Sequence, residues 1–257
     1  MLQTLPAGAW VVFALSYLVQ PTADLAIYGR LWKLPLSGFA ALLRKTAINE
    51  VVLGYGGEIF LYFWARGRPN VVQAPFASVK DVAILSALAS NLLTLVMLAY
   101  SAPRLSQLHL AQHLGPALWV GVGLVTLSLC ILVFARRVFS LPRTALAYVA
   151  AVHALRLLAV SALTVLLWRL ALPAVPLASW IHLLTLRLLV SRAPFVPNKE
   201  LVFGNLVLLL VGADAPVAVL LASLALAWLA AHLLVLTVLG AGDAIRALRL
   251  RSTRAAS

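Results

Sequence analysis

Glu58 is the residue of this sequence whose chemistry is hardest to reconcile with its surroundings. It lies in the apolar stretch NEVVLGYGGEIFLYFWAR, residues 49–66, after Asn49, Glu50 and a cluster of glycines. An isolated carboxylate in apolar surroundings is costly, so such a group faces a polar interior or meets a basic partner. We expect a basic partner from another helix, with Arg156 as the first candidate.

Arg156 is the second residue of this kind. It lies about a dozen residues or more from either end of the apolar run 144–172, and His153 shares its face of a helix at the spacing i, i+3. An arginine this deep in a span is expected to face a polar interior. The histidines show no HExxH or equivalent ligand spacing, so we expect neither a metal nor another cofactor.

Two further polar groups interrupt the second half of the chain. Arg187 follows His182 in IHLLTLRLLVSR, and PFVPNKELVFGN, residues 194–205, combines prolines with Lys199 and Glu200. The candidate substrate-binding residues are Asn49, Glu50, Tyr55, Glu58, Arg66, Arg156, Arg187, Lys199, Glu200 and Asn205. The candidate turn residues are Gly54, Gly56, Gly57 and Pro197.

The composition defines the environment of these groups. Of 257 residues, 63% are hydrophobic and 11% charged, against about 25% charged in soluble domains. The mean hydropathy is +1.03. Such a chain cannot cover itself with polar surface, so its solvent is lipid. The net charge of +13 comes from basic residues beside apolar runs, a pattern typical of membrane topology rather than of nucleic-acid binding. A single cysteine excludes an internal disulfide.

The sequence therefore predicts an all-α integral membrane protein that forms one transmembrane domain over residues 1–257. Eight apolar runs are long enough to be considered as spans. They cover residues 7–29, 46–65, 80–102, 115–135, 144–172, 177–193, 195–212 and 216–240.

The basic residues near the span ends decide between two topologies. If 46–65 crosses the membrane, the basic cluster that contains Lys45 and the cluster that contains Arg66 fall on opposite sides. If 46–65 is a re-entrant hairpin that turns at its glycines, all basic clusters lie on one side. We therefore predict about seven crossings around this hairpin, an external N-terminus and a cytoplasmic, basic tail at 244–257. Because the break at 194–205 falls at the corresponding point of the second half, an inverted repeat is a further hypothesis.

Two stretches resemble a known family. AINEVVLGYGGEIFLYFWARGR resembles the first signature of the lysylphosphatidylglycerol synthase transmembrane region, a flippase-like family of bacterial and archaeal membrane proteins. SRAPFVPNKELVFGNLVLLLVGADAPVAVLLASLAL resembles its second signature, although PNKE replaces a longer glycine-rich turn. The matching residues are Asn49, Gly54, Gly57, Glu58 and Arg66 in the first stretch and Pro197, Glu200 and Gly212 in the second.

The resemblance implies a lipid-handling protein of the cell inner membrane. The aminoacyl-transferase domain of the full-length synthases has no counterpart in this sequence, so we expect no lipid aminoacylation. Basic side chains (Arg156, Arg187, Lys199) would attract the phosphate of a phospholipid or glycolipid headgroup, and Glu58 and Glu200 would balance them.

The leading hypothesis is translocation of a lipid or lipid-linked headgroup across the membrane, without catalytic residues. Two alternatives stay open. One is a membrane-embedded transferase that acts on a lipid-linked substrate, with Glu58 as general base. The other is a non-catalytic subunit of an envelope complex. The sequence leaves open a homo-oligomer or a separate soluble partner enzyme, and it gives no indication of nucleic-acid binding.

Overall fold

The computed structural model describes residues 5–68, 75–107, 138–193, 196–212 and 214–255, together with Gly123, Thr126 and Cys130. All regular secondary structure in these residues is helical, which confirms the predicted all-α class for this part of the chain. In chain order the elements are α1 (Ala7–Trp32), the 3-10 turn η2 (Leu36–Gly38), α2 (Phe39–Val51), α3 (Gly56–Arg66), α4 (Pro75–Gln107), α7 (Arg143–Ala171), α8 (Leu177–Val190), α9 (Lys199–Val211) and α10 (Pro216–Ala255).

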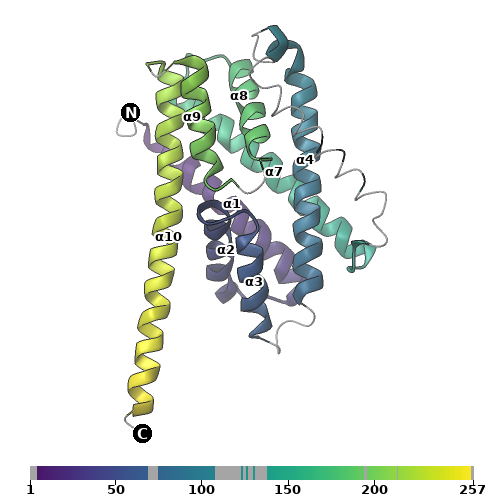
Figure 1. Ribbon diagram of the computed structural model, residues 1–257, viewed down its shortest axis with the longest axis vertical. Coiled ribbons are helices and arrows are strands. Elements are labelled where there is room, and N and C mark those ends of the chain that lie inside the picture. The colour runs from purple at the N-terminus through teal and green to yellow at the C-terminus, as the bar shows by residue number, and fades with distance from the viewer. Residues whose placement is uncertain are drawn as a thin grey trace.

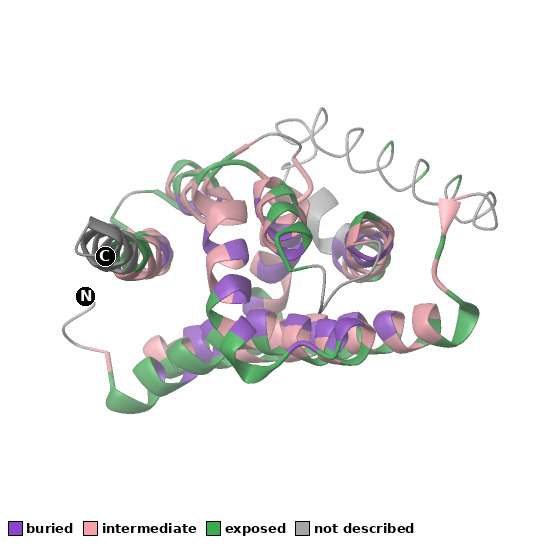
Figure 2. Ribbon diagram, turned by 90° about the horizontal axis from the view of Figure 1, so that it is seen from below, coloured by how far each residue is buried: buried purple, intermediate pink, exposed green. Residues whose placement is uncertain are grey.

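Four of the described helices, α1, α4, α7 and α10, are long and apolar enough to cross a membrane, which takes about 20 residues. Figure 2 shows buried residues where helices face one another and exposed residues on the outward faces. The outward faces carry large apolar side chains, among them Leu15, Val96, Leu158 and Leu234. Surfaces of this kind suit lipid rather than water, so the helices indicate a membrane protein, as the composition predicts.

The prediction of seven crossings is not confirmed. The candidate span 115–135 lies outside the described residues, apart from Gly123, Thr126 and Cys130. The runs 177–193 and 195–212 form α8, with 14 residues, and α9, with 13 residues. Each is shorter than the hydrocarbon core requires. Pro197 disfavours helical backbone in the residue before it, and α9 begins two residues after this proline, at Lys199.

Two short helical hairpins lie between the long helices (Figure 1). We call α2 and α3 the first hairpin, and α8 and α9 the second hairpin. Their turns approach each other end on near the centre of the molecule. The backbone N–H of Asn198, at the start of α9, donates a hydrogen bond of 2.9 Å to the carbonyl oxygen of Glu50, at the end of α2. The first hairpin is longer than the predicted 46–65, because α2 already begins at Phe39.

The long helices that precede the two hairpins, α1 and α7, are antiparallel neighbours. Tyr148 near the start of α7 donates a hydrogen bond of 3.2 Å to the carbonyl oxygen of Ala26 in the second half of α1. Arg156, farther along α7, reaches back to Gln20 on α1. The long helix before the first hairpin therefore runs in the opposite direction to the long helix before the second hairpin.

The glycine-rich turn differs from the prediction. The residue with the left-handed backbone is Tyr55, with φ of 71°, whereas Gly54 and the two glycines that begin α3 lack a positive φ. Asn198 adopts the same conformation, with φ of 53°. Each of these two residues is the N-cap of the helix that leaves its turn, α3 or α9. A left-handed non-glycine residue is strained and persists where its surroundings fix it, so the two hairpins turn by the same device.

The apolar core consists of two clusters. One contains the start of α1, the end of α7, much of α8 and α9 and the start of α10, with Trp168 and Trp180 fully buried or nearly so. The other contains the end of α1, α2, α3 and the starts of α4 and α7, around Tyr28 and Leu42. The residues of α1 and α7 that separate the clusters include Gln20 and Arg156, and these polar residues form the candidate site.

Candidate functional site: a polar cavity between the two hairpins

A cavity of about 370 Å³ lies where the two hairpins meet. Every long helix except α10 contributes to its wall, together with α2, α3 and the turn between α8 and α9. The lining residues that carry a charge or a hydrogen-bonding side chain are Gln20, Asp24, Lys45, Thr46, Asn49, Glu50, Tyr55, Glu58, Ser86, Asn91, His153, Arg156, Ser191, Arg192 and Lys199.

Lys45 of α2 is the centre of the first wall. Its ammonium contacts Asp24 Oδ2 of α1 at 2.8 Å and Glu58 Oε1 of α3 at 3.2 Å. Asp24 is completely buried and Lys45 is 4% exposed. Buried charges require partners of opposite sign, and here one lysine serves two carboxylates. Glu58 is thus paired with Lys45. The sequence predicts Arg156 as its partner, and that prediction is wrong.

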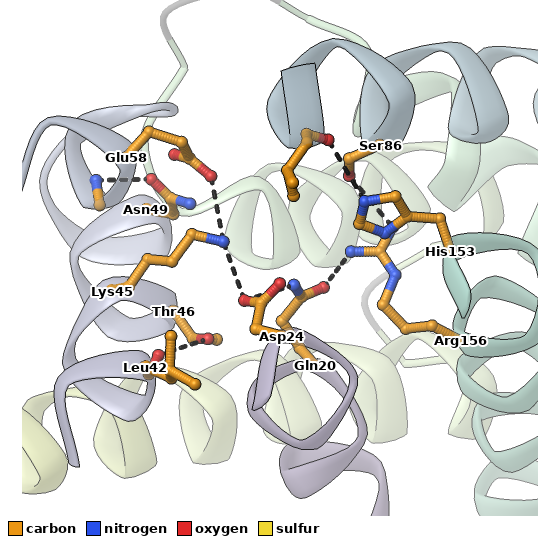
Figure 3. A network of polar contacts seen from close by, with 12 residues as sticks. Gln20, Asp24, Leu42, Lys45, Thr46, Asn49, Glu58, Ser86, His153 and Arg156 are labelled. Carbon is orange, nitrogen blue, oxygen red and sulfur yellow. Dashed lines mark hydrogen bonds and ion pairs between the residues drawn. The ribbon is translucent and has the colours of Figure 1, made fainter. Parts of the chain in front are cut away.

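Arg156 is joined to this group through an amide (Figure 3). Its guanidinium donates to Gln20 Oε1 and, at 3.3 Å, to Ser86 Oγ. Gln20 Nε2 in turn donates to Asp24 Oδ2 at 3.0 Å. A continuous chain of contacts therefore runs from Glu58 through Lys45, Asp24 and Gln20 to Arg156, and we call it the charge chain.

Several buried atoms in this wall have no hydrogen-bond partner among the described residues. They are Asp24 Oδ1, Glu58 Oε2, His153 Nδ1 and Arg156 Nε. His153 uses its other nitrogen, Nε2, to donate to the carbonyl oxygen of Val82 at 3.2 Å. A buried polar atom without a partner is costly, so four of them beside one cavity indicate a cavity that holds water or a polar ligand.

The second wall belongs to the turn of the second hairpin and is basic. Arg192 donates to Asn91 Oδ1 of α4 at 3.2 Å and to Ser191 Oγ at 2.8 Å. Lys199 Nζ donates to the carbonyl oxygen of Ser191 at 2.8 Å. Glu50 is the acidic residue on this side. Neither cation forms an ion pair within the part of the chain that the structure describes.

Asn49 orders the start of α3. The N-cap residue Tyr55 makes no capping hydrogen bond with its side chain. Instead Asn49 Oδ1, from the end of α2, accepts a hydrogen bond of 2.7 Å from the backbone N–H of Gly57. This contact satisfies one of the free N–H groups of the helix start and joins the two arms of the hairpin.

Glu200 and Arg187 form the corresponding ion pair of the second hairpin. Arg187 Nε donates to Glu200 Oε2 at 3.0 Å, and a second nitrogen of the guanidinium binds the other oxygen. In both hairpins a base on the first arm pairs with an acid that lies thirteen residues later, in the first turn of the second arm. This pair borders a separate, much smaller cavity of about 10 Å³.

The structure brings together only part of the predicted site. Gly54 and the side chains of six predicted binding residues line the cavity: Asn49, Glu50, Tyr55, Glu58, Arg156 and Lys199. Arg66 and Asn205 are exposed and do not line it. Arg187 and Glu200 are occupied with each other. Pro197 is exposed in the turn, and Gly56 and Gly57 serve the packing of α3 against α2.

Sequence reasoning missed Gln20, Asp24, Ser86 and Arg192, and it assigned Lys45 to a basic cluster at the membrane surface. Gln20 and Asp24 stand four residues apart in the apolar run 7–29, and residues at that spacing share one face of a helix. That spacing was the available signal. Nothing comparable marks Lys45, because its burial depends on where α2 begins.

Apolar long helices around a polar cavity define a helical membrane protein with a polar internal site. The described residues contain no group of three or more His, Cys, Asp or Glu side chains that could hold a metal ion. No family model, curated protein or solved structure matches the chain.

Proposed function

We propose that the protein translocates the headgroup of a lipid or lipid-linked molecule across the membrane through the cavity between the two hairpins. The observation that carries the proposal is the set of three cations on the cavity wall, Arg156, Arg192 and Lys199, whose hydrogen-bond partners among the described residues are neutral. Cations held by neutral groups are suited to binding an anion such as a phosphate.

The size of the cavity favours a headgroup over a whole lipid. Small-molecule sites typically occupy about 300–1,000 Å³, and this cavity, at about 370 Å³, is at the low end of that range. A phosphate with a small substituent fits such a volume, whereas two acyl chains do not. The chains would therefore stay in the bilayer while the polar part passes between the hairpins.

The proposal includes two re-entrant hairpins related by an inverted repeat. Three observations support it: the antiparallel α1 and α7, the left-handed N-cap residues Tyr55 and Asn198, and the equal spacing of the two ion pairs. Transporters of this architecture place their sites near the midplane, where broken helices from the two repeats meet. The break between α2 and α3 would then lie at membrane depth, covered by protein.

Cysteine labelling tests this topology. On a Cys130→Ser background, Leu36→Cys and Arg68→Cys, at the open end of the first hairpin, should react from one side of oriented vesicles. Ala174→Cys and Asp214→Cys, at the open end of the second hairpin, should react from the other side. All four native residues are exposed. Labelling of positions 36 and 68 from opposite sides would mean that the first hairpin spans the membrane.

Lipid translocation itself is tested in proteoliposomes that contain a trace of fluorescent phosphatidylglycerol. Arg156→Gln or Arg192→Gln should slow the movement of the label between leaflets about 10- to 100-fold, since a hydrogen bond to a charged group is worth about 1.5–3 kcal/mol. Arg66→Gln, at an exposed position outside the cavity, is the matched control and should keep the wild-type rate. Equal rates for all three variants would remove the cavity from the pathway and favour the structural-subunit alternative.

The transferase alternative has less support. It requires Glu58 to act as a general base on a substrate, but Lys45 holds this carboxylate in an ion pair at 3.2 Å.

A further inference from the structure

The charge chain is electrically balanced only if Arg156 is counted. Lys45 contacts both Asp24 and Glu58, so these three groups together carry one negative charge in excess. Arg156, joined to Asp24 through Gln20, supplies the fourth charge and makes the set neutral. Figure 3 shows these side chains in their spatial order, with Glu58 at one end of the charge chain and Arg156 at the other.

Arg156 cannot balance a bound anion and the second carboxylate at the same time. We propose that anion binding at Arg156 is coupled to the uptake of one proton by Glu58, so that the cavity carries an anionic headgroup and a proton together. This inference rests on the proposed function, because it takes the anion to be the phosphate of the translocated headgroup. It adds a driving force, since a proton gradient would then move the headgroup.

Glu58 is better placed than Asp24 to take up the proton. Asp24 is fully buried, lies closer to the ammonium of Lys45, at 2.8 Å, and also accepts a hydrogen bond from Gln20. Glu58 lies farther from Lys45, at 3.2 Å, and its side chain is 16% exposed. Its Oε2 has no hydrogen-bond partner in the described residues. Protonation of Oε2 therefore breaks no hydrogen bond. Asp24 Oδ1 lacks a partner in the same way, so the choice of Glu58 rests on its partial exposure and on its longer contact with Lys45.

Other charged and titratable groups surround the charge chain, and they determine where the anion must bind for coupling to occur. They are Tyr28 on α1, Glu50 on α2, Tyr55 at the start of α3, His153 on α7, Arg192 in the second turn and Lys199 on α9. Arg192 and Lys199 share the second wall with Glu50, so that wall has one positive charge of its own. An anion held by Arg192 and Lys199 alone would need no proton, and coupling requires that the anion also contacts Arg156.

Protonation would also weaken the contact between the two arms of the first hairpin. Neutral Glu58 is attracted only weakly to Lys45, which then pairs with Asp24 alone. The contact between α3 and the lysine on α2 is the ion pair that changes, at the tip of the hairpin beside the cavity. By thermodynamic linkage, the proton and the anion strengthen each other's binding by the same factor.

Calorimetric titration of the purified protein in detergent tests the coupling. The probe is dihexanoyl phosphatidylglycerol, because its phosphodiester keeps one negative charge between pH 5.5 and 8.5. Titrations in two buffers with different ionisation heats give the number of protons taken up. We expect about one proton per bound lipid and an affinity that falls by up to about tenfold per pH unit as pH rises.

Glu58→Gln serves as a permanently neutral form of the residue. It should bind the probe with an affinity that no longer depends on pH and without proton uptake. Asp243→Asn is the control: Asp243 is an exposed acid on α10 that pairs with Arg44 outside the cavity, and its variant should keep the wild-type pH dependence.

The outcomes separate the coupling from the proposed function. Wild-type binding that is lost in Arg156→Gln but involves no proton uptake would overturn the coupling alone. Absence of probe binding to the wild-type protein would overturn the anion site and the coupling with it. The wild-type measurement decides the coupling even if a variant fails to fold.

Discussion

Lys45→Met should lower the free energy of unfolding by about 3–5 kcal/mol, the usual cost of removing one partner from a buried ion pair. The substitution leaves the carboxylates of Asp24 and Glu58 without their common cation, and Asp24 has no exposed surface through which water could compensate. Methionine keeps the length and most of the volume of lysine, so the loss reports charge rather than packing. The measurements are denaturant unfolding and melting temperature of the purified protein in detergent, together with its abundance in the membrane.

Two further variants separate the charge effect from other effects. Lys45→Met combined with Glu58→Gln removes one charge of each sign and should recover part of the lost stability, because Asp24 is then balanced by Arg156, to which Gln20 joins it. Lys33→Met, at an exposed position that follows α1, should change stability by no more than about 0.5 kcal/mol. If the melting temperature of Lys45→Met equals that of the wild-type protein, this lysine does not hold the two carboxylates together.

The long helices could be predicted from sequence because they follow from one free-energy cost, that of placing an unsatisfied polar group in lipid. Backbone and side chains in lipid must be apolar or satisfied within the chain, so apolar runs of sufficient length mark α1, α4, α7 and α10. The same cost made Glu58 and Arg156 conspicuous, and both line the cavity. For these residues the argument required only that a charge deep in a span be placed away from lipid.

The pairing inside the cavity could not be predicted because it depends on helix ends. Lys45 precedes the apolar run 46–65, and the positive-inside pattern placed it in a basic cluster at the membrane surface. In the structure α2 begins six residues before Lys45, at Phe39, which brings the lysine beside Glu58. Asp24 was missed because it lies near the end of its predicted span, where an acid usually meets the membrane surface.

Composition predicted a turn at the glycines of 46–65, but the residue with the left-handed backbone is a tyrosine. Three glycines near the middle of 46–65 favoured a glycine with positive φ, but Tyr55 carries that conformation. Composition does not distinguish a glycine that permits a backbone angle from one that permits a close contact. Gly57 belongs to the second kind: a Cβ atom at this position would lie 2.1 Å from the carbonyl oxygen of Lys45.

Gly57→Ala should therefore disrupt the first hairpin, although alanine favours helices. The added methyl group would overlap the backbone of α2 and would also lie 2.9 Å from Asn49 Oδ1, the atom that accepts the hydrogen bond from the N–H of Gly57. Separation of α2 from α3 would stretch that hydrogen bond and the contact between Lys45 and Glu58. We expect a loss of about 3 kcal/mol or more, at the upper end of overpacking effects because backbone atoms cannot rotate away.

Gly54→Ala is the matched control for this prediction. Gly54 lies three residues earlier in the same turn, its φ is not positive, and no atom would lie within 4 Å of an added Cβ. Its variant should be as abundant and as stable as the wild-type protein, within about 0.5 kcal/mol. The measurement is the melting temperature of each detergent-solubilised variant, followed by gel filtration. Equal stability of the two variants would mean that α2 and α3 do not approach as closely at Gly57 as the hairpin requires, and the contact between Lys45 and Glu58 across the two arms would lose its structural basis.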